Sequence, residues 1–133
     1  MDNPLEEVEQ SDFVDWLDLQ GLKFTAVPNS TWTASWNQKR KNTASGLRKG
    51  FPDVIVLVSP ALSKDGQGYF LCVEMKRRKK STTSPEQKAW REAINGLLSD
   101  TVQSYIAKGS IEAIAIVSLF LKTVVSDGKT TLK

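Results

Sequence analysis

The stretch that decides the fold runs from Gly46 to Trp90 and contains GLRKGFPDVIVLV (46–58), YFLCVEMKRRKK (69–80) and SPEQKAW (84–90). The first two segments are rich in β-branched and aromatic residues, which predicts strands at 54–59 and 69–76. Pro60 and the turn-prone sequence SKDGQG separate them, so we expect an antiparallel hairpin. The third segment predicts a helix over 85–98 that begins at Ser84.

Two acidic residues are placed so that this hairpin brings them together. In the natural register Asp53 lies beside Glu74, and Lys76 projects from the same face as Glu74 because side chains alternate along a strand. Two carboxylates form a hard-oxygen site suited to Mg²⁺ or Mn²⁺, and the backbone carbonyl of Met75 can add a ligand. Such a cation polarises a phosphate oxygen and lowers the pKa of bound water. Lys76 then orients or activates that water, or holds the phosphate.

The combination of Pro52-Asp53, a hairpin and Glu74-Met75-Lys76 resembles the PD-(D/E)xK nuclease signature. The flanking KGFPDVIV, Gln87 and Trp90 resemble its VRR-NUC branch, the virus-type replication-repair nucleases. The resemblance covers most of the chain. It implies a restriction-endonuclease-like α/β fold, in which a mixed β-sheet is flanked by α-helices around an α-β-β-β-α-β core.

The same resemblance implies a function. Members of this family are divalent-metal-dependent endonucleases that hydrolyse DNA phosphodiester bonds. Small stand-alone members from phages are similar in length, often act as homodimers, and in some cases cut branched DNA such as Holliday junctions. The resemblance therefore predicts a DNA endonuclease, selective for branched DNA, in phage replication, recombination or repair.

The resemblance also assigns roles to residues. Asp53 and Glu74 match the metal ligands, Met75 the backbone ligand, Lys76 the catalytic lysine and Gln87 the helix glutamine that supports the site.

A further acid is expected from the first helix, where Glu6, Glu7 and Glu9 compete with Gln10 for the position. Glu6 and Gln10 lie one helical turn apart, whereas Glu9 is nearer the position used in related junction resolvases. We expect Glu6 and Glu9 to be the additional metal ligands.

Outside this stretch the pattern is less decisive. Helical spacing of apolar residues predicts a helix over 4–20, and a short strand is expected at 23–27. In residues 29–50 the apolar residues recur with no sustained spacing, which indicates a long basic loop. We expect a short helical piece over 100–108, a buried strand over 111–117, and either its continuation or a closing helix over 119–126.

Composition limits the possible classes of function. The 133 residues, 40% hydrophobic and 25% charged, predict a single soluble domain spanning 1–133. The absence of histidine excludes Ser-His-Asp and Cys-His catalysis and HExxH zinc proteases. Cys72 is the only cysteine, so an internal disulfide is excluded and a reducing compartment is favoured. We expect a cytoplasmic protein, in the host cytoplasm if it is phage-encoded, with no membrane association.

The net charge of +3 is unevenly distributed. Residues 1–20 hold seven acids and no base, so the remainder carries 18 bases against 8 acids. A cationic face of this kind attracts DNA through counterion release. The residues expected to bind DNA are Lys39, Arg40, Lys41, Arg48, Lys49, Arg77, Arg78, Lys79 and Lys80.

Two other classes of function remain open from the sequence. One is a non-catalytic nucleic-acid-binding module that uses the same basic face. The other is a small interaction protein whose acidic first helix docks a basic partner or masks its own basic face.

Four tryptophans and the single cysteine can be assigned to packing, and two of the tryptophans also to base stacking. Trp32 and Trp36 either stack on exposed bases or pack against the core or a second copy. Trp16 and Trp90 are at core-facing helical positions, and Cys72 is expected to be a small buried hydrophobic residue.

Overall fold

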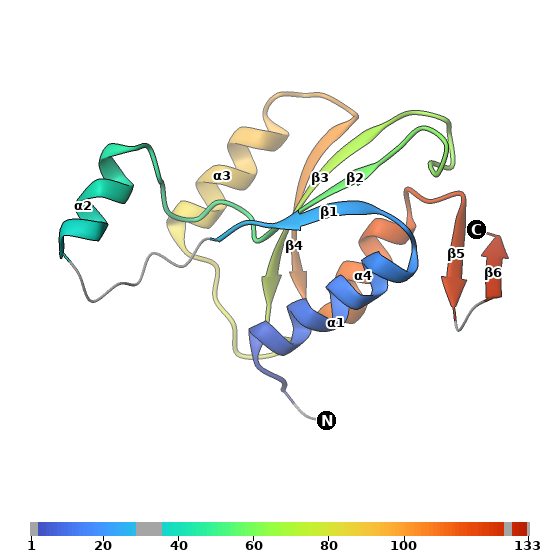
Figure 1. The fold of residues 1–133 in the computed structure, drawn as a ribbon, viewed down its shortest axis with the longest axis horizontal. Helices are drawn as coiled ribbons and strands as arrows, with labels where there is room; N and C mark the ends of the chain where they lie inside the picture. The colour runs from blue at the N-terminus through green and yellow to red at the C-terminus, as the bar shows by residue number, and fades with distance from the viewer. Residues whose placement is uncertain (1–2, 29–35, 127–128, 133) are drawn as a thin grey trace.

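The computed structural model describes residues 3–28, 36–126 and 129–132. In chain order, the elements are α1 Glu6–Leu19, β1 Lys23–Ala26, α2 Trp36–Ala44, β2 Val54–Val58, β3 Tyr69–Lys76, α3 Pro85–Asn95, β4 Val102–Lys108, α4 Ser110–Ser118, β5 Thr123–Ser126 and β6 Lys129–Leu132. Figure 1 shows a central sheet flanked by helices, with α2 extending away from it.

The central sheet has the order β1-β2-β3-β4. Strands β1, β2 and β3 pair antiparallel, whereas β3 and β4 are parallel and are joined through α3. The β2–β3 hairpin is in the predicted register, with Val54 opposite Val73. This mixed sheet confirms the predicted restriction-endonuclease-like architecture, with α2 inserted between the first two strands.

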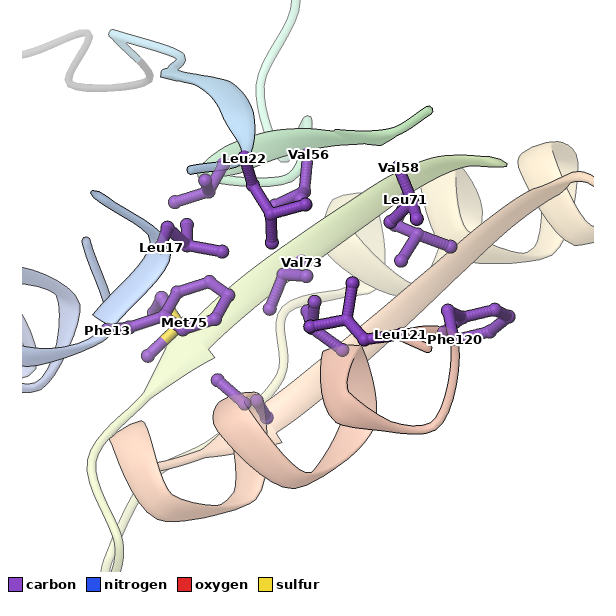
Figure 2. Packing of buried hydrophobic residues seen from close by; sticks show 14 residues of the cluster. Phe13, Leu17, Leu22, Val56, Val58, Leu71, Val73, Met75, Phe120 and Leu121 are labelled. Carbon is purple, nitrogen blue, oxygen red and sulfur yellow. The ribbon is translucent and has the colours of Figure 1, made fainter. Parts of the chain in front are cut away.

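The hydrophobic core fills the space between one face of the sheet and the helices α1 and α4 (Figure 2). Alternate strand residues, such as Val56 on β2 and Val73 on β3, point to this face and are fully buried. Phe13 and Leu17, one helical turn apart on α1, are also fully buried. The sheet's other face carries α3, where the Asn95 side chain pairs with the backbone of Ser104 on β4.

Several expectations for the last third of the chain are wrong. Residues 100–108 were expected to be helical but contain β4, and residues 111–117 were expected to be a strand but lie in α4. Residues 119–126 form neither a closing helix nor a continuation of that strand, since they contain the separate strand β5, which pairs with β6. A largely apolar run such as IEAIAIV fits a buried helix as well as a buried strand, and here it packs as a helix against α1 and β4.

Two further boundaries differ from expectation. The predicted loop 29–50 contains the helix α2, although residues 29–35 lie outside the described part of the chain. Helix α3 ends at Asn95 rather than at residue 98, with Gly96 as its C-cap.

The aromatic residues only partly follow expectation. Trp16 is half-buried and stacks on Phe13, as expected of a packing residue. Trp90 is not in the core: its ring makes an edge contact with Phe51, and its Nε1 donates a hydrogen bond to the Lys49 carbonyl at 2.9 Å. Cys72 is buried, as expected, and burial raises its pKa to about 11. Trp32 and the Trp36 side chain lie outside the described residues.

Candidate metal centre

The site is built on the paired ends of β2 and β3. Asp53 directly precedes β2, and the pairing of Val54 with Val73 continues to place it opposite Glu74. The Asp53 carboxylate accepts a hydrogen bond from the Met75 backbone N–H at 2.8 Å. Its own backbone carbonyl accepts one from Val27 at 2.7 Å. Asp53 is therefore held from both neighbouring strands.

The first helix supplies a third carboxylate. Glu6 opens α1, and single carboxylate oxygens of Glu6, Asp53 and Glu74 all lie within 4.8 Å of one another. Three carboxylates this close repel one another unless protons or a cation neutralise them. The structure thus brings Glu6 to the two strand acids, while Glu7 is exposed on the same turn of the helix.

Glu74 is the most buried member of this group. Glu74 is only 4% exposed, and its Oε1 has no hydrogen-bond partner among the described residues. Burial raises the pKa of Glu74 most, and the hydrogen bond to Asp53 and the charge of Asp53 raise it further, to about 9. The charge of Lys76 acts in the opposite direction. Burial and the charge of Asp53 also raise the pKa of Glu6.

Lys76 and Gln87 form a hydrogen-bonded chain with Glu74. The buried Lys76 ammonium donates to Gln87 Oε1 at 2.7 Å, and Gln87 Nε2 donates to Glu74 Oε2 at 2.9 Å. Gln87 is itself fixed by a capping box, in which Ser84 N donates to Gln87 Oε1 and Gln87 N donates to Ser84 Oγ. The start of α3 therefore sets the orientation of the amide that bridges the lysine and the acid.

The role of Ser84 in fixing this glutamine is the part of the site that the sequence interpretation missed. Ser84 was expected only to begin the helix. The spacing Ser-x-x-Gln over 84–87 is nevertheless the pattern of a capping box and contained the necessary information.

Met75 can contribute to the site only through its backbone. Its side chain is fully buried in the core on the opposite face of β3, and its N–H is used by Asp53.

Glu9, the other acid expected to bind metal, does not join the group. Its carboxylate is fully buried, forms an ion pair with Arg78 at 2.6 Å and accepts a hydrogen bond from Ser110 N at 2.9 Å. Burial alone raises the pKa of Glu9, but the hydrogen bonds from Ser110 and Arg78 outweigh it, so the pKa is lowered overall. Glu9 therefore joins α1 to the start of α4 instead of facing Asp53.

The basic residues expected to bind DNA divide into two sets. Arg77 and Arg78 use their guanidinium groups on the protein itself, bonding respectively to backbone carbonyls before α1 and to Glu9. Members of the other set lie at exposed positions on α2, in the segment after it or in the loop after β3: Lys39, Arg40, Lys41, Arg48, Lys49, Lys79 and Lys80. Within that set, the Arg48 guanidinium donates to the Thr43 carbonyl at 3.0 Å.

The donor set fits a small divalent cation. Carboxylate oxygens are the ligands that Mg²⁺ and Mn²⁺ prefer, and a cation would give the unpaired Glu74 oxygen a partner. It would also offset the repulsion among the three acids. Glu6, Asp53 and Glu74 are the residues that would hold it.

One negative finding concerns membranes. Among the helices of the described ranges, none combines the length and apolar character needed to cross a bilayer.

Comparison with known proteins gives an independent result. The family model of the VRR-NUC domain matches residues 2–110. A solved structure described as a VRR_NUC domain protein superposes with a TM-score of 0.66 at 21% sequence identity, covering 99% of this chain and 100% of that one. No curated protein matches the chain. The family match covers most of the sequence, including Glu6, both strand acids, Lys76 and Gln87, and this chain therefore belongs to the VRR-NUC domain family.

Proposed function

We propose that this protein is a divalent-metal-dependent DNA endonuclease that hydrolyses phosphodiester bonds. The observation that carries the proposal is the convergence of Glu6, Asp53 and Glu74 within 4.8 Å, with one buried Glu74 oxygen left without a partner. Membership of a nuclease-related family supports the same reaction class. Mg²⁺ or Mn²⁺ is the cofactor that this donor set favours.

The chain's own residues have distinct tasks in this proposal. A bound Mg²⁺ or Mn²⁺ supplies Lewis-acid activation of a phosphate oxygen and of water. Asp53 presents carboxylate oxygens from a position that the Met75 N–H fixes. Glu74 offers its unpaired oxygen in a water-poor environment, where electrostatic interactions are strong.

In this proposal Lys76 supplies the positive charge that acts on the reacting phosphate. Its ammonium has three protons, and Gln87 accepts one of them. The remaining protons are available to orient an attacking water or to neutralise charge on the phosphate. Gln87 holds the ammonium beside Glu74, and it is therefore a positioning residue.

DNA would approach over the exposed basic side chains that flank the site. The chain from α2 to Asp53 carries Lys39, Arg40, Lys41, Arg48 and Lys49 and no acid before Asp53. Lys79 and Lys80 are exposed in the segment that follows β3. These residues are proposed to contact phosphates, which fixes the position of the duplex without reading its sequence.

Selectivity for branched DNA and action as a homodimer are the finer parts of the proposal. Selectivity is supported by the basic helix α2, which extends away from the sheet in Figure 1 and so offers phosphate contacts beyond the acidic cluster, whereas the homodimer is proposed from the family resemblance alone. Cleavage of junction, flap, duplex and single-stranded substrates should be compared, with sedimentation of the free protein measured in parallel. Equal cutting of all four substrates would contradict selectivity, and a monomer at working concentration would contradict the dimer.

The main test is cleavage by folded variants. Asp53→Ala, Glu74→Ala and Lys76→Ala should each abolish Mg²⁺- or Mn²⁺-dependent nicking while retaining wild-type circular dichroism. Lys64→Ala, in the turn between β2 and β3, is the control and should cut normally. Full activity of Asp53→Ala or Glu74→Ala would refute the proposal. Salt-sensitive DNA binding in EDTA, with no nicking by wild type once metal is restored, would instead identify a non-catalytic binding module.

A further inference from the structure

The segment that follows β3 holds the residues that precede α1. Arg77 Nη2 donates to the Asn3 carbonyl at 2.6 Å, and Arg77 Nε donates to the Pro4 carbonyl at 3.1 Å. The Asn3 amide bonds in turn to the Lys79 backbone, donating to its carbonyl at 2.9 Å and accepting from its N–H at 3.0 Å. Four hydrogen bonds thus fix the backbone directly before the helix.

Helix α1 does not fix its own beginning. Its N-cap is Leu5, which has an extended backbone and provides no side-chain cap. Glu6 is the first helical residue and is exposed. The two strand acids share one hairpin register, whereas Glu6 comes from a separate element. Its place beside them therefore depends on what holds the chain immediately before it.

A second contact holds α1 one turn further along. Arg78 Nε donates to Glu9 Oε2 at 2.6 Å, and the other Glu9 oxygen accepts from Ser110 N at the start of α4. The Gly109 backbone lies close to the Arg78 side chain, since a Cβ added to Gly109 would be 2.7 Å from Arg78 Cγ. The guanidinium is thus packed between α1 and α4, with its side chain 27% exposed.

We propose that Arg77 and Arg78 are positioning residues of the metal centre, which hold the start of α1 so that Glu6 joins Asp53 and Glu74. This inference rests on the proposed function, since it assigns the two arginines to the same site. It differs from the expectation that the whole basic run contacts DNA phosphates. The exposed Lys79 and Lys80 side chains retain that expected role, while the two arginines act within the protein.

The test is a double-mutant cycle read out by Mn²⁺ binding, measured by electron paramagnetic resonance in the absence of DNA. Glu6→Gln and Arg77→Gln should each weaken Mn²⁺ binding by about 10- to 100-fold. The double variant should bind no more weakly than either single variant, because both changes remove the same ligand. Removing a positive charge near a cation site would by itself strengthen binding, so a loss has the opposite sign to a simple charge effect.

Lys80→Gln is the matched control, because it removes one positive charge from the same run at an exposed position. It should not weaken Mn²⁺ binding. DNA binding in EDTA separates positioning from phosphate contact: Arg77→Gln should keep wild-type affinity and salt dependence, whereas Lys80→Gln should lower both. If Arg77→Gln does not fold, Asn3→Ala, which removes only the bonds to Lys79, should give the same pattern with a smaller loss.

The outcomes distinguish the two proposals. Absence of Mn²⁺ binding by the wild-type protein would overturn the metal-dependent function itself. Normal Mn²⁺ binding by folded Arg77→Gln and Asn3→Ala would overturn only the positioning role. Additive losses in the double variant, or a loss of DNA affinity in EDTA, would likewise assign Arg77 to a task other than placing Glu6.

Discussion

Gln87 shows how one side chain links the helix and strand parts of the centre. Its amide touches Lys76 and Glu74 at the same time, while the Ser84 capping box sets its rotamer. A glutamine suits this position because it donates with one end and accepts with the other. Neither glutamate nor leucine of similar size offers both functions.

Gln87→Ala is expected to reduce the cleavage rate by about 10- to 100-fold, because Lys76 and Glu74 lose their shared partner. The loss should fall on kcat more than on DNA affinity. Ser84→Ala is the matched control: it removes the cap and should cost about 1 kcal/mol of unfolding free energy. The Ser84 backbone N–H that holds Gln87 Oε1 is retained in that control, so Gln87 keeps its bonds to both site residues and the cleavage rate should stay near wild type. Equal rate losses in the two variants would reduce Gln87 to a helix-capping residue.

Strand alternation and hairpin register act over short distances, so the sequence predicted that Asp53, Glu74 and Lys76 lie together, whereas Gln87 was predicted from the family resemblance. It could not choose firmly among Glu6, Glu7 and Glu9, since all three lie in the first turn of one helix, and it favoured both Glu6 and Glu9. The choice is made by Arg78, which lies 69 residues from Glu9 in the chain and pairs with it. Contacts of this separation leave no periodic pattern in the sequence.

Apart from α2, which was expected to be loop, the elements of the first two-thirds of the chain were predicted well because local chemistry specifies them. Strands β2 and β3 have β-branched runs with a turn sequence between them, and α3 has both an N-cap and a proline at its start. Strand β4 and helix α4 lack such markers. Their identities follow from packing against β3 and α1, which the sequence alone does not display.

Gly50 is a point where two elements meet at backbone distance. Its φ is +89°, and an added Cβ would lie 2.6 Å from the Glu86 carbonyl carbon and 2.8 Å from Gln87 N. Gly50→Ala should therefore lower the unfolding free energy by about 1–3 kcal/mol and displace the start of α3. Urea unfolding and cleavage rates would both report the change.

Gly46→Ala is the control for Gly50, because its φ is also positive at +105° but nothing lies within 4 Å of the added atom. It should show the cost of backbone strain without the clash and without loss of cleavage. If the two variants behaved alike, contact between the Gly50 segment and α3 would have no role in the site.

The ion pair of the buried Glu9 with the half-buried Arg78 predicts a pH dependence of stability. The pKa of Glu9 is lowered in the folded protein, so its contribution is fully present above the ordinary value of 4.5 and is lost as the pH falls through the folded value. Glu9→Gln should lower the unfolding free energy by about 1–3 kcal/mol at pH 7. The difference from wild type should shrink below about pH 4.5.

Chemical unfolding across pH 3 to 8 would measure this difference. Glu7→Gln, which changes an exposed acid on the same helix, should follow the wild-type curve throughout. A Glu9→Gln curve parallel to wild type at all pH values would show that the ion pair does not titrate as the structure requires.

At the scale of the whole molecule, charge is arranged asymmetrically. Helix α1, which is rich in acidic residues, and helix α2, which is rich in basic residues, lie in different parts of the molecule in Figure 1. A polyanion is therefore attracted toward the α2 side and repelled from α1. The cluster of Glu6, Asp53 and Glu74, between the start of α1 and the strand ends, then lies at the boundary of the two regions.

A variant with Lys39, Arg40 and Lys41 changed to Gln tests this arrangement. If each of these basic side chains neutralises one phosphate, the slope of the logarithm of the DNA association constant against the logarithm of salt concentration should decrease in magnitude by about 2 to 3. Affinity at low salt should fall, while cleavage at saturating DNA should not. Lys64→Gln is the control, since it lies in the β2–β3 turn away from α2. An unchanged slope in the triple variant would exclude α2 from the DNA-binding surface.

The central claim is that Glu6, Asp53 and Glu74 hold one divalent cation. Anomalous diffraction from crystals soaked in Mn²⁺ tests it most directly. We predict an anomalous peak bonded to oxygens of all three carboxylates, including the Glu74 Oε1 that otherwise has no partner among the described residues. The peak should vanish in Asp53→Ala crystals. Absence of a peak at this group in wild-type crystals, with the ion bound elsewhere or not at all, would contradict the account.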